Sequence, residues 1–316
     1  MPSFTHGTRI TGLGSFLPPR VLTNDEISRM VDTNDEWIVT RTGIHERRVV
    51  DDGVTTSDLA TAAAKAALAD AGVAGDDIDL VVVASATPDM PFPSTASLVQ
   101  DRIGARHAGA FDLSAACSGF VYALVMTSGM LGNGAFRRAL VIGAESLSRI
   151  TDWTDRSTCI LFGDGAGAAV VEAAPAGQGL LSFELGSNGA GGVYLAVPAP
   201  NRKIIQNGRE VYKFAVHTLG ESISRVAEMA CVNPRELDWI VPHQANTRIF
   251  EAAAKRLEIP LERVYSNLDR VGNTSAASIP IALSEMKGRG LLSPGQLVGL
   301  CGFGGGLSWA SAILRY

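Results

Sequence analysis

The order of secondary-structure signals in the first half of the chain recurs in the second half, and this repeat constrains the fold more than any other feature. Each half gives in turn a helix, a buried strand, a second helix, a short strand, a long buried helix and two further strands. This alternation predicts an α/β fold in which two similar units, residues 1–173 and 174–316, pack together. Outside the long buried helix of the first half, the elements are expected at residues 58–71 (with Ser57 as N-cap), 79–84, 94–103, 110–113, 138–143 and 165–171, with counterparts at 214–231, 237–241, 246–257, 264–268, 275–286, 296–300 and 308–314.

The long buried helix of the first half lies in a run without charge. No charged residue occurs between Asp112 and Arg137, and a run of this length is sufficient for a membrane-spanning helix. Its serines, asparagine and glycines are more typical of a helix surrounded by protein, where small residues let neighbouring backbones approach. We therefore expect a central helix and no membrane span. By the repeat, its start near Cys117 is expected close to the start of its counterpart near Asn273.

The composition indicates a globular chain with a slight acidic excess. Charged residues make up 19% of the 316 residues and the net charge is −5, which argues against a nucleic-acid partner or an anionic membrane surface. The four cysteines are widely spaced, and residues 1–6 contain no basic segment leading into an apolar core. The sequence therefore predicts a reduced, cytoplasmic protein without a metal site.

Cys117 is the strongest candidate nucleophile. It follows an expected strand and opens the uncharged helix. Backbone N–H groups and the helix dipole at such a point favour a thiolate, so we expect a lowered thiol pKa. The alternative is a small buried apolar side chain, which is what most free cysteines are.

Three further segments are candidates for the same site. His243 is the one histidine at the carboxyl end of an expected strand, where α/β sheets place their sites, although it can equally be a structural histidine. Asn273 can contribute a polar side chain or simply cap a helix. The glycines of residues 303–306 can expose backbone N–H groups as an oxyanion hole, or form a tight turn.

Several common motifs are absent from the sequence. Residues 163–167 are similar to a dinucleotide-binding loop, but no GxGxxG pattern is present and Asp164 lies inside the segment. Neither a GxSxG serine elbow nor a phosphate-binding P-loop occurs. These absences argue against a nicotinamide enzyme, a serine hydrolase of that type and a P-loop nucleotidase.

Six motifs, in order along nearly the whole chain, carry a specific resemblance. The chain resembles the β-ketoacyl-[acyl-carrier-protein] synthase III family of the thiolase superfamily. The resemblance implies a five-layered αβαβα fold built from two similar halves, and a homodimer. The motifs are residues 35–44, 115–120, 162–167, 242–246, 272–278 and 303–309.

The resemblance also implies a reaction and its catalytic residues. Cys117, His243 and Asn273 match the family's catalytic triad, and the backbone N–H groups of Cys117 and Gly305 match its oxyanion hole. The implied enzyme is an acyltransferase that takes an acyl group from acyl-CoA onto Cys117. It then condenses this group with malonyl-acyl carrier protein, with loss of CO₂ and no cofactor, to initiate fatty acid synthesis.

Two other functions stay open from the sequence. One is a starter condensing enzyme or acyltransferase of secondary metabolism, of the polyketide or quinolone type, in the same family. The other is a non-catalytic partner subunit, which the presence of Cys117 argues against.

The resemblance further implies binding residues around the triad. For CoA, Trp37 and Arg156 would stack on adenine, and Arg41 and Arg248 would contact phosphates and the chain. Tyr212, at a position usually occupied by Phe, would line the pantetheine tunnel. The acyl pocket would include Phe92 (contributed across the dimer interface), Leu147, Phe162, Leu195 and Ile204. A basic patch for acyl carrier protein, or else an ordinary solvated face, would consist of Lys213, Arg248, Lys255 and Arg256.

Overall fold

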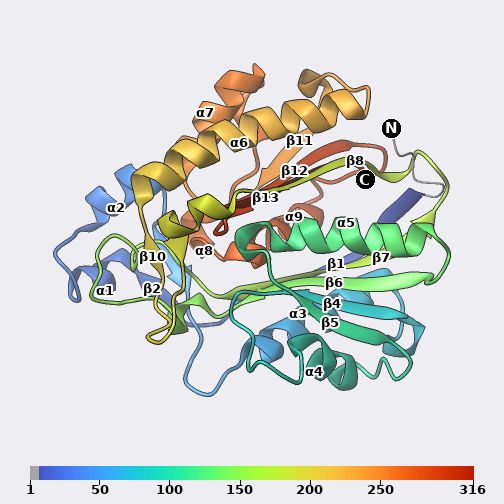
Figure 1. Ribbon diagram of the computed structural model, residues 1–316, viewed down its shortest axis with the longest axis horizontal. Coiled ribbons are helices and arrows are strands. Elements are labelled where there is room, and N and C mark those ends of the chain that lie inside the picture. The colour runs from blue at the N-terminus through green and yellow to red at the C-terminus, as the bar shows by residue number, and fades with distance from the viewer. Residues whose placement is uncertain (1–6) are drawn as a thin grey trace.

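The computed structural model describes residues 7–316, and a nine-stranded sheet runs through it (Figure 1). The two ends of this sheet lie on opposite sides of a layer of helices. The halves of the sheet meet where β8 and β1 pair through Thr8 and Gly179. Across the sheet the strands are β11 (Trp239–Pro242), β12 (Leu297–Gly304), β13 (Ser308–Arg315), β8 (Gly179–Ser187), β1 (Gly7–Phe16), β7 (Gly165–Ala174), β6 (Arg138–Glu145), β4 (Leu80–Ala84) and β5 (Gly109–Leu113).

The two halves of the sheet have the same strand pairing. In one half β5, β4 and β6 pair in parallel, and β7 and β1 follow antiparallel. In the other half β11 and β12 pair in parallel, and β13 and β8 follow antiparallel. The strand expected at residues 264–268 is reduced to a single parallel bridge between Val264 and Ile240. It is cut short because helix α8 (Leu268–Val271) begins there, so that part of the prediction is wrong.

Helices complete five layers, as Figure 1 shows. Helices α5 (Gly119–Gly132) and α9 (Ser278–Gly288) lie between the two halves of the sheet. Helices α3 (Thr56–Ala71) and α4 (Thr95–Arg102) cover one outer face, and α6 (Gly208–Met229) and α7 (Thr247–Leu257) cover the other. The α/β fold with five αβαβα layers is confirmed.

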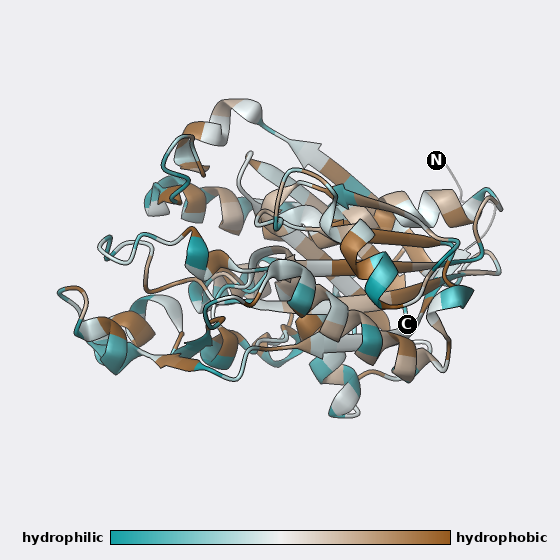
Figure 2. Cartoon of the chain, turned by 90° about the horizontal axis from the view of Figure 1, so that it is seen from below, coloured by the Kyte–Doolittle hydropathy of each residue, from teal (hydrophilic) through white to brown (hydrophobic). Residues whose placement is uncertain are grey.

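The position of α5 explains why the sequence around it carries no charge. Its side chains are buried against both halves of the sheet: Phe120 and Leu124 are essentially inaccessible to solvent. A Cβ atom at Gly119 would lie 3.1 Å from the Cβ of Ala84 and 3.5 Å from that of Ala276, so the starts of the two central helices do lie together. In Figure 2 the strands at the centre are largely hydrophobic. Among residues 7–316, no helix is both long enough and apolar enough to cross a membrane.

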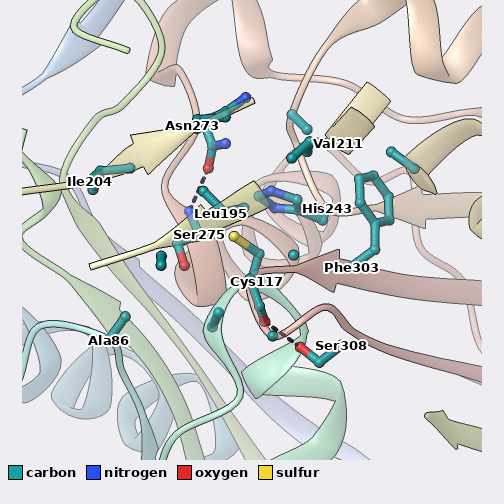
Figure 3. A pocket seen from close by; sticks show the side chains of 18 of the residues that line it. Ala86, Cys117, Leu195, Ile204, Val211, His243, Asn273, Ser275, Phe303 and Ser308 are labelled. Atoms are coloured by element: carbon teal, nitrogen blue, oxygen red, sulfur yellow. Dashed lines mark hydrogen bonds between the residues drawn. The ribbon is translucent and has the colours of Figure 1, made fainter. Parts of the chain in front are cut away.

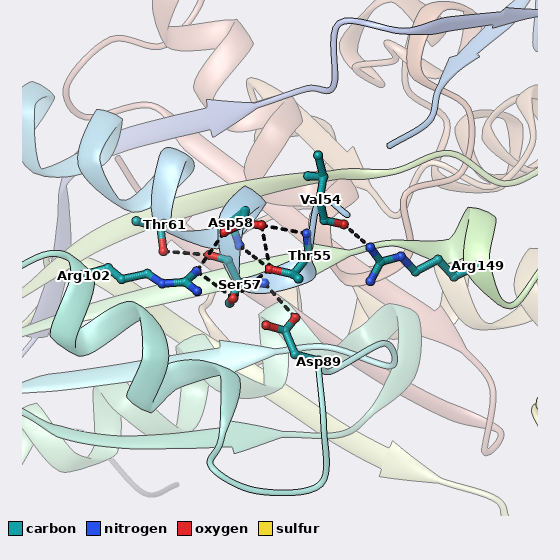
Figure 4. A network of polar contacts seen from close by, with 8 residues as sticks. All are labelled: Val54, Thr55, Ser57, Asp58, Thr61, Asp89, Arg102 and Arg149. Carbon is teal, nitrogen blue, oxygen red and sulfur yellow. Dashed lines mark hydrogen bonds and ion pairs between the residues drawn. The ribbon is translucent and has the colours of Figure 1, made fainter. Parts of the chain in front are cut away.

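Helix α3 begins two residues earlier than the sequence suggested (Figure 4). The hydroxyl of Thr55 accepts a hydrogen bond from the Asp58 amide, and the Asp58 carboxylate accepts one from the Thr55 amide at 2.8 Å. This reciprocal pair makes Thr55 the N-cap. Ser57 lies inside the helix, where its amide donates to Asp89 and its hydroxyl accepts from Arg102. The expectation that Ser57 is the cap is therefore wrong.

Shorter elements surround the edge of the sheet where the site lies. Two small antiparallel two-stranded sheets, β2–β3 and β9–β10, are separate from the main sheet. The β9–β10 sheet lines the cavity described below. The bounds of the short elements are β2 (Val21–Thr23), α1 (Asn24–Ser28), α2 (Asp35–Thr42), β3 (Glu46–Arg48), β9 (Leu195–Ala196) and β10 (Ile205–Gln206).

Candidate active site

Cys117 lies in the turn between β5 and the central helix α5. Its neighbour Ala116 has a φ of 46°, in the region that few residues other than glycine adopt, so the chain turns sharply just before the thiol. Strand β12 of the other half passes close behind this turn. A Cβ atom at Gly304 would lie 2.8 Å from the Cβ of Cys117, so the close approach requires glycine. The nucleophile is thus held by both halves of the chain.

His243 follows β11 and is held by backbone and side-chain contacts. Its amide donates to the Cys301 carbonyl at 2.8 Å, which continues the pairing of β11 with β12. The ring Nδ1 lies 2.9 Å from the hydroxyl of Ser278 on α9, and the ring meets Phe303 edge to face with centroids 5.3 Å apart. With Nδ1 occupied, Nε2 is the ring nitrogen left for a substrate.

Asn273 lies in the loop before the central helix α9. Its backbone bridges to the other half of the chain, because its amide donates to the Leu161 carbonyl and its carbonyl accepts from the Gly163 amide, both at 2.9 Å. Its side-chain Oδ1 accepts from the Ser275 amide at 2.9 Å, as Figure 3 shows. Because the oxygen is occupied in this way, the amide nitrogen is free to donate.

The three side chains converge on one cavity of about 640 Å³ (Figure 3). Four of the five residues expected in the acyl pocket line it, namely Leu147, Phe162, Leu195 and Ile204. Phe92 does not line it, because its side chain is 84% exposed in this single chain. Tyr212, Gly305 and Asn246, the N-cap of α7, also line the cavity. Asn246 belongs to the motif at residues 242–246 but was not predicted to be a site residue.

The pKa of the Cys117 thiol is shifted in the opposite direction from the prediction. Burial raises the pKa of Cys117 to about 12, although hydrogen bonds from Ser275 and from the backbone of Cys117 and Gly305 act to lower it. The prediction of a lowered pKa is therefore wrong for the unliganded protein. A helix terminus is too weak to compensate for removing a thiolate from water. The backbone amides of Cys117 and Gly305, the two expected oxyanion-hole donors, both lie next to the sulfur.

His243 is neutral throughout the physiological range. Burial lowers the pKa of His243 to about 3, and the hydrogen bond with the Ser275 backbone opposes this only in part. A neutral imidazole can donate one hydrogen bond, and because burial lowers the pKa of this ring so far, it is a poor base for the Cys117 proton. The ring is thus suited to stabilising charge on a substrate oxygen.

Comparisons with known proteins agree with this geometry. Residues 111–189 match the model of the family described as 3-Oxoacyl-[acyl-carrier-protein (ACP)] synthase III, and residues 227–316 match that of its C terminal part. The β-ketoacyl-[acyl-carrier-protein] synthase III of Geobacillus kaustophilus is 52% identical over 310 residues, covering 98% of this chain and 99% of that protein. The chain belongs to the β-ketoacyl-[acyl-carrier-protein] synthase III family. As a member of this family it is a condensing acyltransferase.

Solved structures support the same assignment. The 3-oxoacyl-[acyl-carrier-protein] synthase III of Aquifex aeolicus superimposes with a TM-score of 0.96 at 46% identity, covering 98% of this chain and 100% of that one. The priming β-ketosynthase of the R1128 polyketide pathway superimposes with a TM-score of 0.93 at 36% identity, covering 99% and 97%. The five-layered fold is therefore that of the synthase III family.

The residues that the family resemblance assigns to CoA lie beside the cavity, where the lining residue Asn246 donates to the Arg41 carbonyl at 2.8 Å. The guanidinium groups of Arg41 and Arg156 lie 4.8 and 4.9 Å from the centroid of the Trp37 ring. Arg156 also donates to the Asp32 carbonyl at 2.9 Å, and Arg248 donates to the Thr40 carbonyl at 3.0 Å. An adenine ring inserted between Trp37 and Arg156 would need about 7 Å between the two planes, so the Arg156 side chain would have to move.

The basic patch expected for a synthase III is exposed on α6 and α7. Lys213, Arg248, Lys255 and Arg256 are all exposed, but two of them have acidic partners. Lys213 pairs with Glu210 at 2.8 Å, and Arg256 forms an ion pair with Glu221. Lys255 and Arg248 are thus the charges most available to a partner.

Two buried residues next to the triad were also missed. Ser275, with a φ of 49°, lines the cavity, and Glu145, at the end of β6, is fully buried close enough for Ser275 to lower the pKa of its carboxyl group. Ser275 lies inside the family motif at residues 272–278, so the motif could have drawn attention to it. Glu145 lies just beyond the expected end of its strand at residue 143. Within residues 7–316, no group of three or more His, Cys, Asp or Glu side chains could hold a metal ion.

Proposed function

We propose that Cys117, His243 and Asn273 catalyse a decarboxylative condensation of an acyl group from acyl-CoA with malonyl-acyl carrier protein. The observation that supports this most is their convergence, from the turn before α5, the end of β11 and the loop before α9, on one largely apolar cavity. The enzyme would act in the cytoplasm, without a cofactor, at the start of fatty acid synthesis.

The first half of the reaction loads the nucleophile. The sulfur of Cys117 attacks the thioester carbonyl of acyl-CoA, the new S–C bond forms, and the CoA sulfur leaves. The N–H groups of Cys117 and Gly305, which lie around the sulfur, hold the oxyanion of the tetrahedral intermediate. Each such donor typically contributes about 3–4 kcal/mol to the transition state. The acyl chain lies among Leu147, Phe162 and Ile204, which form one hydrophobic cluster.

The second half forms the carbon–carbon bond. His243 Nε2–H and the Asn273 side-chain amide donate hydrogen bonds to the thioester carbonyl of the malonyl group, so that electrons left by departing CO₂ collect on that oxygen as an enolate. For this role Nδ1 of His243 must carry no proton, so the Ser278 hydroxyl has to donate to Nδ1 rather than to the Ser275 carbonyl, which lies 2.8 Å from it. The enolate carbon attacks the acyl group on Cys117, and collapse of the intermediate releases the sulfur. The product is a β-ketoacyl thioester two carbons longer than the primer.

The substrate carriers would bind at the mouth of the cavity. The Trp37 ring and the guanidinium groups of Arg41 and Arg156 would hold adenine and phosphates of CoA, with Tyr212 and Arg248 along the tunnel. The exposed patch of Lys213, Arg248, Lys255 and Arg256 would receive the acidic acyl carrier protein.

A homodimer would complete the pocket. The exposed Phe92 side chain lies on a loop of this chain away from its own cavity, which is compatible with insertion into the pocket of a second copy. The two halves, residues 1–173 and 174–316, would be the units of an ancient duplication, since their strand orders correspond.

The experiment that tests this function measures the two half reactions, acylation and condensation, separately. The protein is incubated with a panel of acyl-CoA esters, acylation of Cys117 is read by intact mass and peptide mapping, and malonyl-acyl carrier protein is then added. We expect one acyl class to load, followed by CO₂ release and a β-ketoacyl product. Loading without CO₂ release would instead indicate a simple acyltransferase, and no loading by any donor would indicate a non-catalytic subunit.

A starter enzyme of secondary metabolism is the second candidate, because the R1128 priming β-ketosynthase has the same fold at 36% identity. The same panel separates the two candidates. Loading and condensation with the carrier protein of fatty acid synthesis favour the first, whereas activity confined to a different carrier protein favours the second.

A further inference from the structure

The proposed reaction leaves one proton without an acceptor. Cys117 must lose its thiol proton before or while it attacks acyl-CoA, since the thiolate is the nucleophile. His243 is neutral and resists protonation. A second titratable group, Glu145, is buried behind the nucleophile and takes no part in the chemistry described so far.

Glu145 is a fully buried carboxyl group without a cationic partner among the described residues. It accepts hydrogen bonds from the Thr87 hydroxyl at 2.8 Å, the Ala86 amide at 3.1 Å and, more weakly, the Ser85 hydroxyl at 3.4 Å. Ser275 and the Ala276 backbone, from the other half of the chain, complete the set. Buried carboxylates normally have a cation beside them, because an isolated buried charge is costly. A group arranged in this way is well suited to accept a proton.

The Ser275 hydroxyl connects this carboxyl group to the nucleophile. It lines the cavity beside Cys117, and it acts to lower the pKa of both the Glu145 carboxyl and the Cys117 thiol. In Figure 3 the Ser275 and His243 side chains approach Cys117 from opposite sides. Ser275 has a positive φ, which costs energy for a residue with a Cβ atom. This backbone conformation places its side chain beside Cys117 (Figure 3).

We propose that Glu145 accepts the Cys117 proton through the Ser275 hydroxyl when the enzyme is acylated. The Cys117 S–H bond breaks as the bond from sulfur to the acyl carbon forms. The proton passes to Ser275 Oγ while the proton of that hydroxyl passes to the Glu145 carboxylate. The CoA thiolate leaves and takes a proton from solvent. This step rests on the proposed function, because it belongs to acylation by acyl-CoA.

The proton would stay on Glu145 until the product forms. When the condensation intermediate collapses, Cys117 leaves as a thiolate and recovers the proton along the same path. In between, a neutral Glu145 keeps a second negative charge away from the enolate. The like charge of an ionised Glu145 raises the pKa of Cys117, so transfer of the proton to Glu145 removes the repulsion that opposed thiolate formation.

The groups that face Glu145 are mostly uncharged, and the pKa of Glu145 therefore sets the pH dependence that the proposal predicts. The groups facing it are hydroxyls and amides after β4 (Ser85, Ala86, Thr87), Ser275 and Ala276 before α9, and Gly165 across the β7 pair. Cys117, from the turn before α5, is the titratable group among them. Burial raises the pKa of Glu145 to about 7, with the hydrogen bonds opposing it. Since the acceptor must be ionised, acylation should slow as pH falls below about 7.

The test measures the pre-steady-state rate of Cys117 acylation by acetyl-CoA, and by the best ester of the panel, between pH 5.5 and 9. Alkylation of Cys117 by iodoacetamide is followed over the same range. The variants are Glu145→Gln and Ser275→Ala. The matched control is Asp164→Asn, which removes another buried carboxylate whose partners are Ser148 and Val50 and which does not line the cavity.

We expect the wild-type protein and Asp164→Asn to share an inflection near pH 7. Glu145→Gln should lose this inflection and acylate about 100-fold more slowly at pH 7.5, within the usual range for loss of a general base. Ser275→Ala should lose the inflection although it keeps the carboxyl group. Condensation started from pre-acylated enzyme should be less affected than acylation in both variants.

Two results would overturn the proposal. One is an inflection retained in both variants, or absent from the wild-type protein. The other is an equal loss at every pH in Glu145→Gln and Asp164→Asn, which would mean a purely structural role. If the wild-type protein is not acylated by any ester, the proposed function fails. The iodoacetamide profile then decides the proton acceptor by itself, since alkylation needs the thiolate but no CoA site.

Discussion

The Nδ1 atom of His243 lies 2.9 Å from the Ser278 hydroxyl, so the first residue of α9 fixes a ring that follows β11. The next residue in the chain is held to the same point, since the Gln244 amide lies 3.4 Å from that hydroxyl. The central helix of the second half therefore sets the direction in which Nε2 points into the cavity.

Replacing Ser278 with alanine should release this ring. We expect Ser278→Ala to slow malonyl decarboxylation about fivefold to tenfold, the equivalent of one hydrogen bond of about 1–1.4 kcal/mol. Acylation of Cys117 should change less than decarboxylation, because Ser278 reaches the thiol only indirectly, through its hydrogen bond to the Ser275 carbonyl at 2.8 Å. Rapid-quench assays of acylation and of decarboxylation measure the two rates. An equal loss in both would show that the variant disturbs the whole site.

Asn273→Ala should separate the two half reactions more strongly. The side-chain amide donates only to the malonyl carbonyl in the proposed mechanism, so acylation should remain within about twofold of the wild-type rate. Decarboxylation should fall about 100-fold or more, as for loss of one oxyanion donor. The measurement is CO₂ release from malonyl-acyl carrier protein by pre-acylated enzyme. If acylation fell equally, the role assigned to Asn273 would be wrong.

Gly304→Ala should show how closely β12 approaches the nucleophile. The new methyl group would lie 2.8 Å from the Cβ of Cys117, so the turn before α5 must shift. We expect a loss of about 1–3 kcal/mol in the free energy of unfolding and a large loss of acylation. Gly129→Ala in α5 is the control, since among the described residues a Cβ there has no neighbour within 4 Å apart from the backbone of its own helix. It should be neutral or stabilising in a denaturant titration.

Much of this site follows from local sequence patterns, and the rest depends on contacts between distant segments. Cys117, His243 and Asn273 each stand at a strand end or a helix start, where a pattern is readable. The pKa of Cys117 was predicted in the wrong direction because desolvation depends on β12, whose Gly304 lies 187 residues further along the chain. Glu145 was missed for a similar reason: a carboxylate in a strand gives no sign that its partners come from the loop after β4 and from Ser275.

The short strand at residues 264–268 fails for a local reason. Its apolar pattern was correct for burial, and Val264 and Tyr265 are indeed buried. The segment forms only one bridge, at Val264. The Asn267 carbonyl accepts hydrogen bonds from the first turn of α8, so it does not continue the pairing with β11. Competition between a strand and a helix start over a few residues is decided by such contacts.

The buried neutral state of His243 predicts a pH dependence of stability. The pKa of His243 is lowered from 6.5 to about 3 in the folded protein, so the unfolded chain binds an extra proton between these values. This group's contribution is fully present above about pH 6.5 and is lost as pH falls toward 3. Compared with His243→Gln, the wild-type protein should lose up to about 1.4 kcal/mol more per pH unit in this window. Urea titrations at pH 7, 6, 5 and 4 measure the two slopes, and parallel slopes would contradict a buried neutral ring.

Charge reversal on α7 tests the surface proposed for acyl carrier protein. Lys255 is exposed and forms no ion pair with any residue of 7–316, whereas its neighbour Arg256 pairs with Glu221. We expect Lys255→Glu to raise KM for malonyl-acyl carrier protein several-fold, because the patch and an acidic partner then repel each other at the encounter. The rate of acylation by acyl-CoA should stay unchanged.

Lys65→Glu provides the matched control for this prediction. Lys65 is equally exposed, but it lies on α3, in the outer layer on the opposite side of the molecule from α7 (Figure 1). The same change in net charge at that site should leave KM for malonyl-acyl carrier protein near the wild-type value. Rising salt should reduce the difference between the two variants, since it screens exposed charges beyond about 10 Å at 0.1 M. Equal KM values for both variants at low salt would place the docking surface away from α7.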